Sequence, residues 1–250
     1  MLFQTLDVKN QCVGYYVNES FVYGHPITEL TQTWDYSPSL RNLDIDYARV
    51  YCGGKTLTDV CPPQYQNMWS EIKSRLARYL KALGTAKIDL DEVCFYDLIP
   101  EHFLFEFCDM KNEITKSVFA KKSRPQNYRL FANILKFLGD IRQQPLNVNI
   151  GAIKHKGGSI AGRNFINRLQ KVRWVCDYNP WGTITGRLAT NPNSFPIMTM
   201  NKEFRACLEP HHDWFVELDY NAAEVRTLLA LSGQEQPMND IHEWNMKNIY

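Results

Sequence analysis

Several short segments between residues 183 and 242 carry side chains that could bind a metal ion, a nucleotide or a nucleic acid. Asp219 ends the apolar run 214–218, and a predicted helix follows at once. A carboxylate held at the end of a strand suits Mg²⁺, which takes oxygen ligands and commonly keeps waters and substrate phosphates. Taken alone, Asp219 or Asn221 is more simply explained as the N-cap of that helix.

The surroundings of Asp219 change this interpretation, because further motifs stand around it in a fixed order. Residues 185–188 read Thr-Gly-Arg-Leu, residues 203–205 Glu-Phe-Arg, residues 219–226 Asp-Tyr-Asn-Ala-Ala-Glu-Val-Arg and residues 240–242 Asp-Ile-His. This succession closely resembles family A DNA polymerases, the group of bacterial DNA polymerase I and many phage replicases. The resemblance covers about 172–250, and four positions of the second-last motif are substituted: Asn221, Ala222, Ala223 and Val225.

The resemblance implies how the reacting groups would be held. Asp219 would be one of two carboxylates that hold two catalytic Mg²⁺ ions, with the Tyr220 carbonyl as a further ligand. Glu224 would pack beside the incoming sugar and exclude a 2′-hydroxyl, and His242 would contact the triphosphate of the dNTP. From proximity alone, we expect Arg226 to orient Asp219 or Glu224 through an ion pair.

The resemblance also implies contacts to primer-template DNA. Arg187 would reach the minor-groove edge near the primer terminus, where acceptors on every base pair allow sequence-tolerant binding. Thr185 and Asn193 are further candidate DNA contacts in the same region. In the family motif that matches 219–226, a glutamine follows the serine, and this glutamine is Ala222 here. The contacts to DNA that the glutamine amide makes in the family are therefore not implied for this chain.

The charge distribution independently predicts a surface for a polyanion. The net charge is only +1, but residues 111–187 hold 15 Lys and Arg against three acids, and the rest of the chain carries a net −11. Such a block favours nucleic acid, while a solvated helical face is the alternative. The candidate DNA contacts in this block are Lys121, Lys122, Arg124, Lys154 and Lys156.

The elements that must position these residues follow from hydrophobic periodicity. Strands are predicted at about 2–8, 12–17, 21–23, 172–175 and 214–219. Helices are predicted at about 62–83, 103–121, 126–144, 222–231 and from 240 onward. We expect the helices 103–121 and 126–144 to form an antiparallel hairpin with a basic tip, and 154–159 to be a basic, flexible loop.

The predicted fold class is α+β, with four regions in chain order. Residues 1–60 form a small β-rich region, 61–100 a helical connector, 101–171 a basic helical thumb and 172–250 the first part of a polymerase palm containing an antiparallel sheet. A proofreading exonuclease is not predicted, because its Asp-x-Glu pair reads Asp7-Val8-Lys9 and thus has a cation where a carboxylate is needed.

The resemblance also leaves parts of a polymerase without a match. The family's fingers helix and the His-Asp-Glu segment that carries the second metal carboxylate are not found, so we expect the chain to be inactive by itself. The chain would be either a truncated polymerase or one subunit of a split polymerase, whose second chain carries the fingers and remaining palm. The alternatives are a non-catalytic subunit that binds primer-template and, least well supported, a structural protein with a basic surface.

Composition limits the remaining classes. A hydrophobic fraction of 44% in 250 residues excludes a disordered or fibrous chain, and the longest apolar runs are too short to span a membrane. The seven cysteines are scattered without zinc-site spacing, which favours reduced thiols. The expected location is the cytoplasm, of a bacterial host if the polymerase is phage-encoded.

Overall fold

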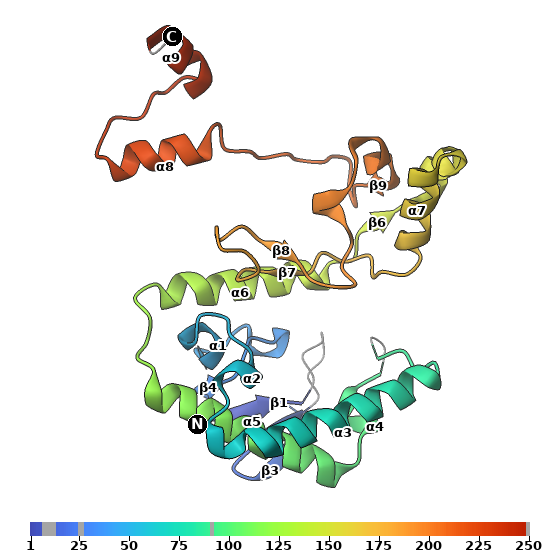
Figure 1. Ribbon diagram of the computed structural model, residues 1–250, viewed down its shortest axis with the longest axis vertical. Helices are drawn as coiled ribbons and strands as arrows, with labels where there is room; N and C mark the ends of the chain where they lie inside the picture. The colour runs from blue at the N-terminus through green and yellow to red at the C-terminus, as the bar shows by residue number, and fades with distance from the viewer. Residues whose placement is uncertain (7–13, 25–27, 91–92, 249–250) are drawn as a thin grey trace. The chain divides into compact units, whose positions relative to one another are not determined.

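A computed structural model describes residues 1–6, 14–24, 28–90 and 93–248. Contacts within the chain divide it into two units, residues 1–209 and 210–250 (Figure 1). Helices and small, mostly antiparallel sheets make up the chain, which confirms the α+β class. The finer division into four regions stays a prediction.

The predicted N-terminal strands form a three-stranded antiparallel sheet. Its order is β1 (Phe3–Thr5), β2 (Gly14–Val17) and β3 (Ser20–Tyr23), with Phe3 opposite Val17. Asn18 and Glu19 join β2 to β3 with positive φ angles of 47° and 58°, as a two-residue hairpin turn requires. Asp7-Val8-Lys9 lies outside the described residues.

The next described segment, residues 28–60, consists of short elements. β4 (Gln32–Thr33) pairs in parallel with β5 (Asp46–Tyr47), and η1 (Pro38–Leu40), α1 (Ala48–Tyr51) and α2 (Leu57–Val60) complete it.

Three long helices follow close to their predicted bounds: α3 (Gln66–Thr85, after η2, Pro63–Tyr65), α5 (Glu101–Lys121, after α4, Phe95–Leu98) and α6 (Tyr128–Gln143). Gln4 fastens the sheet to α5, because its side-chain amide donates to Asn112 at 2.9 Å and to Thr115 at 3.1 Å inside the core. Tyr128 fastens α6 to β5, because its hydroxyl accepts from the Tyr47 amide at 2.8 Å. Residues from 3 to 50 and from 128 to 135 therefore share one core.

The expected antiparallel hairpin of α5 and α6 is wrong. The short helix α1 lies between the facing ends of these helices, and its Tyr51 ring contacts Phe119 of α5 and Tyr128 of α6 at centroid distances of 4.9 and 5.5 Å. Both helices thus pack on α1 rather than along each other (Figure 1). The short connector between the helices predicted that they pack against each other. Aromatic contacts with Tyr51 instead make α1 the packing partner of both helices.

Residues 145–209 contain a small core of their own. It is covered by a two-stranded sheet of β6 (Asn147–Val148) and β9 (Leu208–Glu209) and by four helical segments, and its fully buried members include Ile153, Leu169, Phe195 and Cys207. The helical segments are η3 (Ile150–Gly158), α7 (Ile160–Leu169), η4 (Ile197–Thr199) and η5 (Lys202–Cys207).

The predicted flexible loop at 154–159 is therefore wrong, because most of it belongs to η3. Ser159 ends η3 and caps α7, since its hydroxyl accepts from the Gly162 amide at 2.9 Å. Gly162 allows the close approach of the two helices, because a Cβ there would overlap the Lys156 carbonyl. The strand expected at 172–175 is also absent from the described residues, where Val175 makes only an isolated bridge to Pro145.

The second unit contains α8 (Ala223–Leu231) and α9 (Ile241–Asn248), close to the predicted helices. The predicted strand 214–219 pairs with no other strand in the described parts of the chain, so this prediction is wrong for the chain by itself. A strand needs a neighbour for its backbone N–H and C=O groups, and the sequence pattern cannot supply one. Among the described residues, no helix is long and apolar enough to cross a membrane.

Candidate functional site

The Thr-Gly-Arg segment lies at the tip of a β-hairpin. Strands β7 (Tyr178–Asn179) and β8 (Ala189–Thr190) pair antiparallel, and the connecting loop carries Thr185 and Arg187. The Thr183 hydroxyl donates to the Arg187 carbonyl at 2.7 Å and closes the tip. Gly186 has a φ of +75°, a backbone conformation that favours glycine. The side chains of Thr185 and Arg187 are exposed, as a DNA contact requires.

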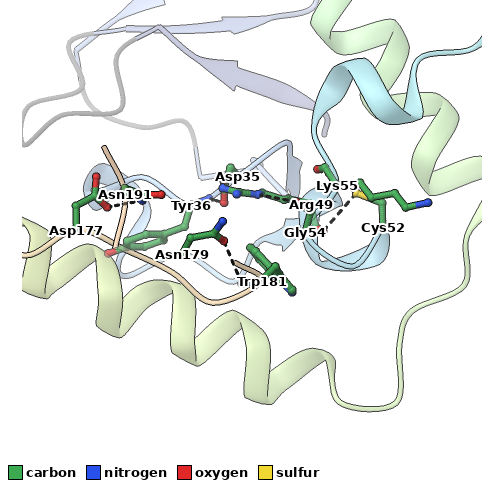
Figure 2. Close-up of polar contacts among 10 residues, drawn as sticks. All are labelled: Asp35, Tyr36, Arg49, Cys52, Gly54, Lys55, Asp177, Asn179, Trp181 and Asn191. Carbon is green, nitrogen blue, oxygen red and sulfur yellow. Dashed lines mark hydrogen bonds and ion pairs between the residues drawn. The ribbon is translucent and has the colours of Figure 1, made fainter. Parts of the chain in front are cut away.

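The same loop is clamped to the N-terminal region through Trp181 (Figure 2). The Arg49 guanidinium lies over the indole at 4.9 Å, and Phe131 of α6 stacks on the indole with centroids 6.2 Å apart. Asp35 holds Arg49 in place with an ion pair at 2.7 Å. Gly54 completes the clamp, because a Cβ there would overlap the indole, with Cε3 at 2.6 Å. No motif predicted this clamp, and the signal in the sequence that fits it is the Gly53-Gly54 pair.

Asp177 fastens the base of the hairpin. Its carboxylate accepts from the Asn191 amide at 3.0 Å (Figure 2) and pairs with Arg142 of α6 at 3.5 Å. Asn193 lies just beyond in a turn with a φ of +64°, and its carbonyl accepts from the Arg173 amide at 3.0 Å. The Asn193 side chain is exposed, so it remains available as the predicted DNA contact.

The five predicted basic contacts differ in how far their charge is already compensated. Arg124 pairs with Asp46 at 3.3 Å and lies over the Tyr128 ring at 4.4 Å, and Lys156 is 3.7 Å from Glu203. Exposed ammonium groups lie at the end of α5 and on η3, and the described residues offer them no ion pair: Lys121, Lys122 and Lys154.

In the second unit, Asp219 and Tyr220 are exposed in the unpaired segment before α8. Their donors, a carboxylate and a backbone carbonyl, are the hard oxygen ligands that fit Mg²⁺. The described residues contain no group of three or more His, Cys, Asp or Glu side chains arranged to hold a metal ion. The second carboxylate of the predicted two-metal site thus stays a prediction.

Asn221 connects the two motifs of the second unit. Its side-chain oxygen accepts from the Ile241 amide at 3.1 Å, and its side-chain nitrogen donates to Asp240 at 2.5 Å. The alternative that Asp219 or Asn221 caps α8 is therefore wrong: Ala222 stands at the N-cap, with a φ of +50° and no side-chain cap. Residues 219–226 and 240–242 are thereby held side by side.

Arg226 reinforces this connection in a way that the sequence did not predict. Its guanidinium donates to three backbone carbonyls, those of Asn221 at 2.9 Å, Pro237 at 2.8 Å and Asn239 at 3.0 Å. These bonds fix the loop that joins α8 to α9. The expected ion pair with Asp219 or Glu224 stays a prediction.

Asp240 begins α9, because its carboxylate accepts from the backbone amides of His242 at 2.7 Å and Glu243 at 3.3 Å. These amides, first that of His242, lower the pKa of Asp240, and the Asn221 amide adds to the effect. Glu224 lies in the first turn of α8 and His242 in the first turn of α9. Both side chains are exposed, as contacts to a nucleotide require.

Protein-family models, curated proteins and solved structures were compared with this chain, and none matches it. The site must therefore be interpreted from its own chemistry. The first unit presents a clamped arginine loop and uncompensated lysines, a combination suited to phosphate backbones. The second unit presents a carboxylate, a histidine and a glutamate on two motifs that are bonded together.

Proposed function

We propose that this chain is the N-terminal, thumb and partial palm portion of a DNA-directed DNA polymerase that resembles family A. The observation that carries the proposal is the ordered succession of Arg187, Asp219, Glu224 and His242 behind a basic block. The bonds from Asn221 to Asp240 and Ile241 support it, because they hold two of the motifs together.

In this proposal, the chain's own residues position the reactants of nucleotidyl transfer to a primer 3′-hydroxyl. Asp219 and the Tyr220 carbonyl would hold Mg²⁺, which stabilises the charge on the attacking and leaving oxygens when it is bound. His242 would hold the triphosphate of the dNTP, and Glu224 would exclude a ribose. Arg187 would hold the primer-template duplex. Positioning and charge stabilisation of this kind are the main contributions of a protein to phosphoryl transfer.

The test is primer extension by the polymerase assembly that contains this chain, with Asp219→Ala against Glu217→Ala. Glu217 is a matched control, because it is an exposed carboxylate two residues away in the same unpaired segment. We expect Asp219→Ala to abolish Mg²⁺-dependent extension and Glu217→Ala to retain it. Extension that persists in Asp219→Ala would rule out the proposed catalytic role.

A second candidate function, a non-catalytic primer-template-binding subunit of a split polymerase, is favoured by the exposed segment before α8. Trp214, Val216, Leu218 and Tyr220 alternate along it with exposed fractions of 80–91%. Apolar surface of this extent on an extended, unpaired segment is typical of an interaction site. We expect a second chain bearing the His-Asp-Glu segment to co-purify with the wild type but not with Val216→Lys. Equal co-purification would argue against a contact at this segment.

A further inference from the structure

A concave pocket in the first unit lies between the α1–α2 connection and the C-terminal end of α5. Its volume is about 300 Å³, and apolar groups from Tyr51, Val60 and Val118 contribute to its lining. Three lysines also line it: Lys55, Lys121 and Lys122. Lys55 comes from a region to which the sequence assigned no function, and it joins two predicted DNA contacts.

The pocket lysines differ from the cations on either side of them along the chain. Lys116 pairs with Glu113 at 2.6 Å, and Arg124 pairs with Asp46 at 3.3 Å, so both charges are already compensated. Within the described part of the chain, the pocket lysines have no ion-pair partner within 4 Å. Three lysines without an ion pair among the described residues therefore line one pocket.

The acid among the lining residues is already engaged by its neighbours. The Asp59 carboxylate accepts from the Thr56 amide at 2.9 Å and from the Thr56 hydroxyl at 2.7 Å, which caps α2. Even with this carboxylate counted in full, the lining carries a net charge of +2. The negative end of the α5 dipole also lies here, and Lys121 in its last turn offsets it.

We propose that this pocket binds a phosphate group between Lys55 and the Lys121–Lys122 pair. Ammonium groups bind phosphate as mobile point charges, and three of them around one pocket suit an oxyanion that shares its charge over several oxygens. The source that we favour is a phosphodiester of a nucleic-acid backbone, and this choice rests on the proposed function. Free phosphate has the same chemistry and is the other source.

This inference gives the N-terminal region a role. Lys55 follows the Gly53-Gly54 turn, and Gly54 of that turn clamps Trp181 together with Arg49 of α1. One turn would thus contribute to a phosphate site and also hold the loop that carries Arg187. Nucleic acid bound by the basic block would contact both the N-terminal region and the end of α5.

The first arm of the test measures how strongly a labelled duplex of about 20 base pairs binds the full chain over 50–300 mM NaCl, by fluorescence anisotropy. The slope of log affinity against log salt concentration decreases in magnitude by about 0.9 for each phosphate contact that is removed. Because the three lysines share one phosphate, we expect Lys55→Ala and a Lys121→Ala/Lys122→Ala variant each to reduce the slope by up to about 0.9, and the two combined to reduce it no further. Lys116→Ala is the matched control, an α5 lysine whose charge is already paired, and its slope should not change.

The second arm measures the melting temperature with added inorganic phosphate at constant ionic strength. A ligand that binds the folded state raises the melting temperature by mass action. If phosphate does so in the wild type but not in Lys55→Ala while the DNA slopes are unchanged, the pocket binds free phosphate instead of the backbone. All substituted lysines are exposed, and far-UV circular dichroism checks that each variant folds.

The two arms separate this proposal from the proposed function. If the wild type binds the duplex but no pocket variant changes the slope, and phosphate leaves the melting temperature unchanged, the pocket proposal is overturned and the proposed function stands. If the wild type binds no duplex, the proposed function fails, and the phosphate arm alone decides the pocket.

Discussion

Gly54→Ala tests whether the Trp181 clamp fixes the Arg187 loop. Gly54 has a φ of +79°, where an alanine costs about 1–2 kcal/mol. The new Cβ would also overlap the indole and displace it from Arg49 and Phe131. A lost cation–π contact of about 0.5–2 kcal/mol and a lost ring pair of about 0.5–1.5 kcal/mol bring the expected destabilisation to about 2–5 kcal/mol.

The matched control is Gly53→Ala, one residue earlier. Gly53 also has a positive φ, +63°, but a Cβ there would meet nothing within 4 Å. Only the backbone cost of about 1–2 kcal/mol should remain. The difference between the two variants therefore measures the clamp, at about 1–3 kcal/mol.

Urea unfolding followed by far-UV circular dichroism measures both variants, and the same pair in a Trp181→Ala background closes a double-mutant cycle. Once the indole is removed, Gly54→Ala should cost no more than Gly53→Ala. Equal destabilisation of Gly53→Ala and Gly54→Ala in the wild-type background would refute the clamp.

Three further predictions concern other parts of the chain. Gly84→Ala should stabilise α3 by about 0.5–1 kcal/mol in urea unfolding, because this helical position has open space around its Cβ. Arg226→Ala should speed amide hydrogen exchange over 234–241 in the second unit, since three carbonyls lose their donors; unchanged exchange would contradict this role. Desolvation, and then the hydrogen bond to Asp46, raise the pKa of Tyr51 to about 12, so the folded state prefers the neutral phenol. That contribution is complete below pH 10 and is lost as pH rises from 10 to 12, and urea midpoints over this range should fall less in Tyr51→Phe.

Much of the secondary structure could be predicted, because it depends on local patterns. Alternation placed the strands over 14–17 and 20–23, and apolar spacing placed the helices 66–85 and 101–121. The wrong predictions concern strand pairing and helix packing, which depend on contacts with residues distant in sequence. The segment 214–219 pairs with no strand in the described parts of the chain, and α1 separates two helices that a short connector joins.

The candidate site divides in the same way. The motifs predicted Asp219 and His242 as candidate site residues, but they did not predict the hydrogen bonds that hold the two segments together. The Arg226 guanidinium donates to backbone carbonyls of the loop between α8 and α9. No residue pattern in the sequence predicts the path of this loop. Lys55 belongs to no motif, and its position beside Lys121 in the lining of the pocket follows only from the folded structure.

The most direct test of the central claim is the binding of primer-template DNA by the 250-residue chain as a function of salt. Because backbone phosphates would be the main contact, affinity should fall linearly with salt on logarithmic axes and be similar for unrelated sequences. Arg187→Ala should weaken binding to all of these duplexes alike. Binding that does not change with salt, or no binding at 50 mM NaCl, would contradict the account.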